Sequence, residues 1–258
     1  MNNALNESQE LAGLRALVTG GASGIGLATV RVLEQRGASV AILDIAEQGP
    51  EASIFAHADV SSDESVRRAV GEVLAKLGGL DILVNCAGIG AQGDVSTNSD
   101  QEWHEVFDIN VVGVARVTRA CLDALRTSSR AAIVNVSSIA ATVGLPDRVL
   151  YSATKGAVLA MTMAMAADLL PDGVRVNAVN PGTTDTPWIS RLLDRATDPD
   201  AERAALAARQ PHGRLVSSDE VAWAIAYLAT SSSGSTTGTY LAVDGGMQRL
   251  RTRPTPSA

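Results

Sequence analysis

The chain has 258 residues, of which 46% are hydrophobic and 19% are charged, with a formal net charge of −7 and an isoelectric point near 5.0. These values predict a soluble globular protein of one domain without a basic surface, so we expect neither nucleic acid nor a membrane as a partner. Two cysteines without CxxC spacing and only three histidines predict no metal site.

The two ends of the chain, residues 1–10 and 249–258, are predicted to be flexible around a single domain at 11–248. The N-terminal residues have neither a basic start nor an apolar core, which predicts no signal peptide. The most apolar run, Ala157–Leu170, is interrupted by Thr162 and Asp168 and is shorter than the ~20 residues that a bilayer requires. We therefore expect a cytoplasmic protein.

Apolar strands alternate with helices along the chain. Strands that are apolar throughout and separated by helices indicate a parallel sheet covered on both faces. The predicted fold is a doubly wound, Rossmann-type α/β domain with a small helical lid insertion at 183–217 over the substrate site, and such sheets bind ligands at the carboxyl ends of their strands. Strands are predicted at 15–20, 39–44, 80–88, 131–138, 174–182 and 240–246, and helices at Ile25–Arg36, Ser62–Lys76, Gln101–Leu125, Ser152–Leu170 and Asp219–Ala229.

The first predicted strand continues into TGGASGIG, from Thr19 to Gly26, before the first helix. Gly20, Gly24 and Gly26 allow a tight turn and a close approach of the backbone to a pyrophosphate, which the amides of the helix N-terminus would bind. The second strand ends at Asp44, where a carboxylate accepts hydrogen bonds from an adenosine ribose and repels a 2′-phosphate. This pattern predicts NAD as the cofactor; the alternative for Asp44 is a turn residue at the end of a strand.

A tyrosine and a lysine lie four residues apart in YSATK, at the start of an apolar helix. The spacing places Tyr151 and Lys155 on one helix face, one turn apart. An ammonium group beside a tyrosine favours the phenolate and makes the phenol a usable acid or base near neutrality. Taken alone, YxxxK is a loose pattern that also fits two surface side chains.

Seven motifs occur in the order and spacing of one protein family. They are TGGASGIG at 19–26, DV at 59–60, NCAG at 85–88, Asn110 in FDINVVG, NVSS ending at Ser138, YSATK at 151–155 and NPGTTDTP at 180–187. In this series the chain resembles the short-chain dehydrogenase/reductase family from about Leu11 to Met247. The resemblance implies hydride transfer between a nicotinamide and a carbon that bears a hydroxyl or carbonyl group, without a metal.

The resemblance also implies the roles of individual residues. Tyr151 is the acid–base residue, Lys155 assists it and holds the nicotinamide ribose, and Ser138 hydrogen-bonds the substrate oxygen. Asn110 supports a water chain that carries the proton to solvent. Cys86 departs from the family, which more often has a second Asn there. Besides Tyr151 and Lys155, the implied cofactor contacts are Gly20, Ser23, Gly24, Ile25, Gly26, Asp44, Asp59, Val60, Asn85, Ala87, Gly88, Pro181, Gly182, Thr184 and Thr186.

Arginines in and near the predicted lid favour a small anionic substrate, because a guanidinium binds a carboxylate through paired hydrogen bonds. Arg191 and Arg195 fit equally well as solvated partners on a surface helix over 191–210. PGTTDTPWISRLLD and ARQPHGRL resemble a branch of the family that includes 2-keto-3-deoxy-L-fuconate dehydrogenases and cytosolic 3-hydroxybutyrate dehydrogenases. That resemblance implies sugar-acid metabolism, with oxidation of the 4-hydroxyl of a 2-keto-3-deoxy sugar acid, and a lid residue, Trp188, over the reacting carbon. The implied substrate site is Ser138, Arg148, Tyr151, Trp188, Arg209 and Gln210.

Two other functions fit the same motifs. A reductase of ketones or of carrier-bound 3-oxoacyl chains would favour NADPH, which Asp44 and the acidic net charge disfavour. A dinucleotide-binding regulator without chemistry would be expected to have lost Tyr151 or Lys155, and both are present.

The helix predicted at 152–170 is apolar nearly all round. A helix packed on a sheet uses one face, so an apolar outer face predicts a partner that covers it. We expect a dimer through the helices at 101–125 and 152–170, and the family resemblance implies a homotetramer. The alternative is a helix buried by its own chain.

Overall fold

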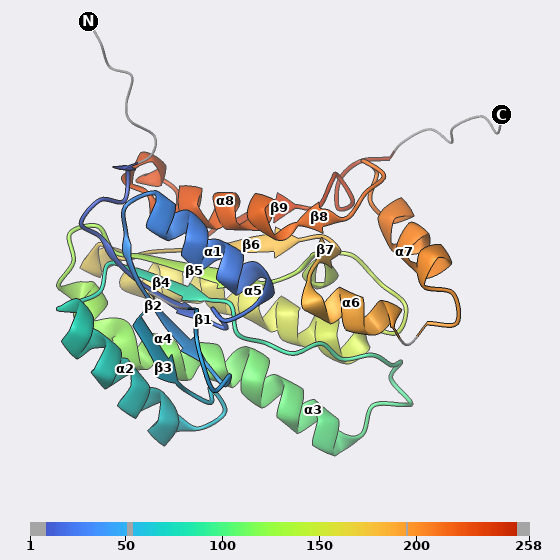
Figure 1. Cartoon of the computed structure of the whole chain (residues 1–258), viewed down its shortest axis with the longest axis horizontal. Helices are drawn as coiled ribbons and strands as arrows, with labels where there is room; N and C mark the ends of the chain where they lie inside the picture. Colours follow the sequence, from blue (N-terminus) through green and yellow to red (C-terminus); the bar gives the residue numbers. More distant parts are fainter. Residues whose placement is uncertain (1–8, 51–53, 195, 252–258) are drawn as a thin grey trace, which may run out of the picture.

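The computed structural model describes residues 9–50, 54–194 and 196–251. Within them, seven parallel strands form one sheet (Figure 1): β1 (Arg15–Thr19), β2 (Ser39–Asp44), β3 (Ile54–His57), β4 (Ile82–Asn85), β5 (Ala132–Val136), β6 (Arg175–Pro181) and β9 (Tyr240–Val243). Their order is β3-β2-β1-β4-β5-β6-β9, so the direction of strand addition reverses between β1 and β4. Ligands of such sheets bind at this reversal, beyond the carboxyl ends of the strands.

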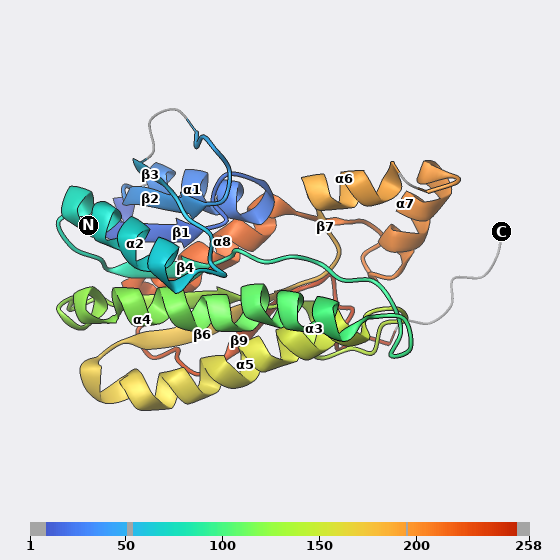
Figure 2. The ribbon, with the colours of Figure 1, turned by 90° about the horizontal axis from the view of Figure 1, so that it is seen from below.

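Helices cover both faces of the sheet: α1 (Gly24–Gln35), α2 (Asp63–Leu77), α3 (Asp100–Phe107), α4 (Gly113–Arg126), α5 (Val149–Leu169) and α8 (Ser218–Ala229). On one face, Val30 of α1 and Ile225 of α8 belong to one buried cluster with the strands. On the other face, Val70 of α2 and Leu125 of α4 are buried in a second cluster that also includes α5. Figure 1 shows α1 and α8 above the strands and α2 and α4 below them, and Figure 2 is viewed from the side of α2, α4 and α5. The predicted doubly wound fold is confirmed.

Two elements differ from the sequence prediction. The segment predicted as one helix at Gln101–Leu125 is α3, a π-helical turn at Asp108–Val112, and then α4. The wider π-helical turn directs the buried side-chain amide of Asn110 toward the loop after β4. Such turns are common at functional sites. The sequence does not predict β3, because four residues at a sheet edge give too short a pattern.

Helix α5 has the length and composition of a membrane span when extended to Val149–Asp172. In the fold it packs on β6 and carries two buried polar side chains toward the sheet, Lys155 and Thr162. The hydroxyl of Thr162 accepts a hydrogen bond from the amide of Asn135 on β5. We therefore interpret α5 as a core helix whose outer face is uncovered in one copy of the chain.

The predicted lid insertion at 183–217 contains β7 (Thr184–Asp185), α6 (Pro187–Leu193), α7 (Pro199–Ala208) and β8 (Val216–Ser217). The surface helix predicted over 191–210 is broken, because Asp198 caps α7 and Pro199 lacks the amide that a continuous helix would need. The lid has its own small cluster of buried residues, Ile189, Leu193, Leu206 and Leu215.

The predicted flexible ends fall largely outside the described residues. Those that are described make contacts. Glu10 forms an ion pair with Arg36, and the amide of Leu250 donates to the carbonyl of Gly246.

Candidate active site

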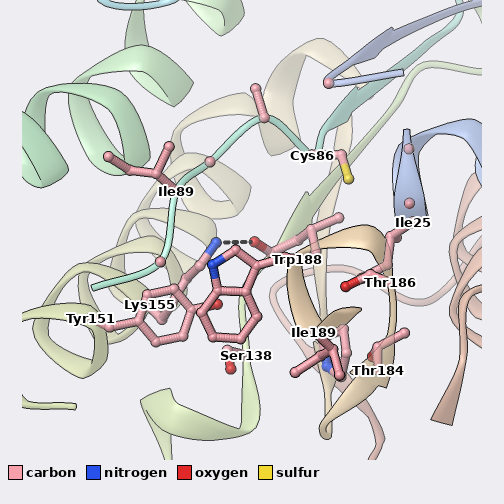
Figure 3. Close-up of a pocket in the computed structure, with 18 of the residues that line it drawn as sticks. Ile25, Cys86, Ile89, Ser138, Tyr151, Lys155, Thr184, Thr186, Trp188 and Ile189 are labelled. Atoms are coloured by element: carbon pink, nitrogen blue, oxygen red, sulfur yellow. Dashed lines mark hydrogen bonds between the residues drawn. The ribbon is translucent and has the colours of Figure 1, made fainter. Parts of the chain in front are cut away.

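A cavity of about 630 Å³ lies beyond the carboxyl ends of β1, β2, β4, β5 and β6, and the lid helices α6 and α7 form its far wall. Figure 3 shows part of its lining, with residues from α5 facing residues from the lid. Most of the predicted site residues line this cavity: Gly20, Ser23, Gly24, Ile25, Gly26, Asp44, Asp59, Val60, Ala87, Gly88, Ser138, Arg148, Tyr151, Lys155, Pro181, Gly182, Thr184, Thr186, Trp188 and Arg209. The structure thus brings together residues from eight separate segments of the chain.

The glycine-rich turn after β1 packs without room for side chains. A Cβ on Gly20 would lie 2.9 Å from the Cα of Ala87, and one on Gly26 would collide with the carbonyl oxygen of Gly20. The first turn of α1 has no acidic residue, and its N-cap, Ser23, makes no capping hydrogen bond through its side chain. The amides of this turn therefore face the cavity without a side-chain acceptor, which fits the binding of a pyrophosphate.

Asp44 lies at the end of β2, and its carboxylate is held by the backbone. One oxygen accepts from the amide of Ala22 at 2.9 Å, and the other accepts from the amide of Ala46 at 3.0 Å. Each oxygen keeps a lone pair for a further donor. The two backbone hydrogen bonds thus hold the carboxylate in place at the cavity wall.

The three side chains expected to carry the reaction lie around one point of the cavity. The ammonium nitrogen of Lys155 donates to the carbonyl of Val136 at 3.0 Å and lies 5.7 Å from the ring centre of Tyr151. Lys155 is only 6% exposed, so most of its positive charge is shielded from water. The hydroxyl oxygen of Ser138 accepts from the amide of Ala140 at 3.1 Å, which leaves its proton for a ligand oxygen.

Asn110 has a different position from the other predicted catalytic residues. It is 1% exposed and does not line the cavity. Its amide donates to the carbonyl of Ile89 at 2.9 Å and accepts from the amide of Ile89 at 2.8 Å, and it also donates to Thr154. Asn110 thus joins the loop after β4 to α5, one residue before Lys155. The water chain predicted for it stays a prediction.

Arginines lie at the lid end of the cavity. The guanidinium of Arg148 lies 6.0 Å from the ring centre of Trp188 and donates to the carbonyl of Asp147. Burial lowers the pKa of Arg148 below its ordinary value, and the positive charge of Arg209 lowers it further. No ion pair of Arg148 or Arg209 is found within the described residues. Two such guanidinium groups attract an anion to this end of the cavity.

Two predicted contact residues, Asn85 and Gln210, do not line the cavity. Asn85 points away from the cavity and donates to Thr118 and Asn135, which is the consequence of its alternating position on a buried strand. Gln210 is 1% exposed and donates to the carbonyls of Thr183 and Arg214, so it braces the lid from behind and does not line the cavity. The ligand contacts of these two side chains stay predictions.

The remaining lid arginines have mixed positions. Arg191 lines the cavity, Arg195 lies outside the described residues, and Arg214 forms a two-pronged ion pair with Glu220 at 2.7 and 2.8 Å. The spacing of these arginines along the sequence does not predict which of them line the cavity. The helix is broken between α6 and α7, so residues on either side of the break do not share one helical period.

Several lining residues were missed by sequence reasoning. Cys86 lines the cavity, and burial raises the pKa of its thiol to about 12, so it stays protonated at neutral pH. The position of Cys86 directly after β4 could have predicted this, because ligands of such sheets bind beyond the carboxyl ends of the strands. Other lining residues have no sequence pattern that points to a ligand: Ile89, Gly90, Ala91, Ile109, Val136, Ser137, Ile139, Ala140, Leu145, Thr183, Pro187, Ile189, Leu192 and Leu206.

Comparisons with known proteins give a consistent picture. A family model described as enoyl-(acyl carrier protein) reductase matches residues 20–248. The chain is 40% identical over 242 residues to a cis-4-hydroxycyclohexanecarboxylate dehydrogenase of Sinomonas cyclohexanicum, covering 90% of this chain and 95% of the relative. It is 39% identical over 242 residues to a cyclopentanol dehydrogenase of Comamonas, with 89% and 95% covered. The ligand-free structure of an aldohexose dehydrogenase of Thermoplasma acidophilum superposes with a TM-score of 0.91 at 29% identity, covering 96% of this chain and 99% of that one.

Proposed function

Because the chain belongs to the short-chain dehydrogenase/reductase family and is an oxidoreductase of CH–OH groups, we propose that it oxidises a secondary alcohol that also carries a carboxylate, with NAD as the hydride acceptor. The observation that supports this proposal is the polarity of the cavity. A fixed carboxylate, Asp44, lies at one end. Arg148 and Arg209, which form no ion pair among the described residues, lie at the other end together with Tyr151.

The chain's own residues supply binding and proton transfer. When bound, the nicotinamide accepts the hydride that leaves the alcohol carbon. Tyr151 as phenolate takes the hydroxyl proton, and the buried charge of Lys155 stabilises that phenolate. The hydroxyl of Ser138 donates to the substrate oxygen and fixes it beside Tyr151. In the reverse direction Tyr151 returns the proton to a carbonyl oxygen.

Asp44 supports NAD over NADP. Its carboxylate can accept from both hydroxyls of an adenosine ribose, and it would repel a phosphate at the 2′ position. The basic residues that line the cavity, Arg148, Lys155, Arg191 and Arg209, come from α5, α6 and the end of α7, not from the segment around β2. Among the described lining residues, no basic side chain next to Asp44 could bind a 2′-phosphate.

The carboxylate of the substrate would be bound by Arg148 and Arg209. Arg148 lies 6.0 Å from the ring centre of Trp188, the charge of Arg209 acts on Arg148, and both arginines line the cavity with Tyr151. The Sinomonas relative is named for a ring alcohol with a carboxylate. Deoxy sugar acids, such as 2-keto-3-deoxy-L-fuconate, carry the same two groups and belong to the proposed class.

The proposal is tested by NADH formation with matched pairs of alcohols. One member of each pair carries a carboxylate, for example cis-4-hydroxycyclohexanecarboxylate beside cis-4-methylcyclohexanol, and the series includes deoxy sugar acids and 3-hydroxybutyrate. We expect kcat/KM to be at least about tenfold higher for the acids, since a hydrogen bond to a charged group contributes about 1.5–3 kcal/mol. Repeating the series with NADP tests the cofactor.

A neutral ring alcohol is the second candidate substrate, because the Comamonas relative is named for cyclopentanol. Equal rates for acids and neutral alcohols would favour it and would contradict the carboxylate site. Activity that requires NADPH and a carrier-bound 3-oxoacyl chain would contradict both candidates.

We also propose that the chain forms a homotetramer that contains a dimer through α4 and α5. The outer face of α5 and its neighbours exposes Val112, Val149, Leu170 and Met163, the last 57% exposed. Apolar side chains gathered on one surface favour burial by a second copy. Light scattering is expected to give four times the chain mass. Met163→Glu is expected to lower the assembly state, and an unchanged mass would place the interface elsewhere.

A further inference from the structure

Gly90 lies in the loop after β4, directly against the indole of Trp188 from the lid. A Cβ built on Gly90 would lie 2.8 to 3.0 Å from three atoms of that indole, Cζ2, Cε2 and Nε1. Real Cβ atoms show almost no contact this short, so any side chain at position 90 would force the indole to move. Gly90 and Trp188 are 98 positions apart in the chain, and both line the cavity.

The backbone does not require glycine at this position. Gly90 is not among the described glycines with a positive φ, unlike Gly93 in the same loop. An alanine is therefore compatible with the backbone of residue 90, and the one obstacle to it is the indole. Glycine at position 90 is therefore needed for the close approach of the lid and not for a backbone turn.

The indole lines the same cavity as the side chains expected to carry the reaction. Figure 3 shows Trp188 over the group formed by Ser138, Tyr151 and Lys155. The guanidinium of Arg148 lies 6.0 Å from the ring centre. Trp188 is 38% exposed and belongs to α6, a helix that is fixed by the small buried cluster of the lid. The depth to which the indole descends therefore decides how much room remains above Tyr151.

We propose that Gly90 is a specificity-determining residue: it lets Trp188 close onto the loop after β4 and so restricts the site to compact substrates. The inference rests on the proposed dehydrogenase function. One small ring or a short chain fits between the indole and Tyr151, whereas a bulky group must displace the indole. A methyl group at position 90 lifts the indole and loosens this limit.

The test compares Gly90→Ala with a matched control, Gly144→Ala. Gly144 is exposed in the loop before α5, its φ is not in the left-handed region, and a Cβ there meets no atom within 4 Å. The trial substrates are ring alcohols and hydroxy acids of rising size, from cyclopentanol to 4-tert-butylcyclohexanol. We expect Gly90→Ala to raise KM for the compact members at least about fivefold and to narrow the rate difference between compact and bulky members. Gly144→Ala is expected to match the parent.

The contact itself is tested without substrate by acrylamide quenching of the Trp188 emission, taken as the difference between each protein and its Trp188→Phe variant. Quenching is expected to rise in Gly90→Ala and to stay unchanged in Gly144→Ala. In the Trp188→Ala background, which removes the ring, Gly90→Ala is expected to have little effect on the size profile. An equal effect in both backgrounds would overturn the proposal.

The two proposals fail in different ways. Turnover of neutral alcohols alone would overturn the carboxylate site and leave the size limit in place. A size profile and a quenching constant that do not respond to Gly90→Ala would overturn the role of Gly90 and leave the dehydrogenase assignment in place. Failure of every alcohol in the series to react would overturn the proposed function, while the quenching result would still decide the contact.

Discussion

The floor of the cavity and its lid are built in different ways. The floor consists of strand ends and the start of α5, where Lys155 is buried and donates to the carbonyl of Val136. Behind it, Asn110 of the π-helical turn is buried and hydrogen-bonded to the backbone of Ile89. The lid rests on one small cluster centred on Ile189 and Leu206. Its arginine at the end of α7, Arg209, is exposed.

This difference separates the reaction from the choice of substrate. Groups that exchange a proton must be held within a fraction of an ångström, and a floor tied to the core supplies that precision. Groups that recognise a substrate can lie on elements with few buried contacts, which move and change at low cost in stability. Variants in the floor should therefore alter turnover, and variants in the lid should alter KM and selectivity.

The largest effect is expected for Tyr151→Phe. Loss of the phenol removes the proton acceptor, and we expect kcat to fall by about 10³-fold, within the range for acid–base residues. Binding of NADH, measured by fluorescence titration, should be retained. Tyr227→Phe on the exposed side of α8 is the control and should keep the parent rate. Turnover by Tyr151→Phe near the parent rate would remove this residue from the proton transfer.

A smaller effect, confined to the lid end, is expected for Arg148→Gln. The variant loses a charge-assisted bond to the substrate, so KM for the hydroxy acid should rise about tenfold to a hundredfold with kcat little changed. The KM for a neutral alcohol should stay the same. Arg130→Gln removes an exposed charge just before β5, at the opposite end of that strand from the cavity, and serves as the control. An equal rise in KM for acids and neutral alcohols would mean that Arg148 shapes the cavity and does not bind the carboxylate.

Asp44→Asn is expected to act on the cofactor and spare the substrate. We expect the ratio of kcat/KM for NAD over NADP to fall about tenfold, because an amide neither accepts two hydroxyls nor repels a phosphate as strongly. Thermal unfolding must accompany this measurement, since Asp44 also accepts from Ala22 and Ala46. An unchanged ratio would show that another group reads the ribose.

The smallest effect on activity is expected at the end of the strands opposite the cavity, where Asp81 precedes β4. Burial opposes the ionisation of Asp81, but hydrogen bonds from Arg15 and Ser128 outweigh it and hold the pKa of this carboxyl at about 2. A lowered folded-state pKa contributes stability above the ordinary value, and this contribution is lost as the pH falls toward 2. We expect the free energy of unfolding of Asp81→Asn to be about 2 kcal/mol lower at pH 7, with a flatter decline between pH 4 and pH 2.

Turnover provides the control for that measurement. Asp81 lies at the start of β4, away from the strand ends that form the cavity, so kcat at pH 7 should not change in Asp81→Asn. A loss of turnover while the protein is fully folded would show that the two ends of the strands are coupled. It would contradict the view that the cavity floor is independent of the opposite end of the sheet.

The sequence by itself determined the sheet, its cofactor end and the tyrosine–lysine pair. Strands such as β2 and β5 are mostly apolar because both faces of the sheet are covered, and that pattern is local. The glycines after β1 are needed by close packing within one turn, and the spacing of Tyr151 and Lys155 follows from the helix period. Each of these features depends on residues that are near one another in the chain.

Only the tertiary structure decided how the lid meets the floor. No pattern in the sequence places Gly90 against Trp188, turns Gln210 away from the cavity, or pairs Arg214 with Glu220. These outcomes depend on the path of a lid that is broken at Pro199 and on contacts between segments far apart in sequence. Periodicity describes what one element buries, whereas the partner that it meets is set by packing among all of them.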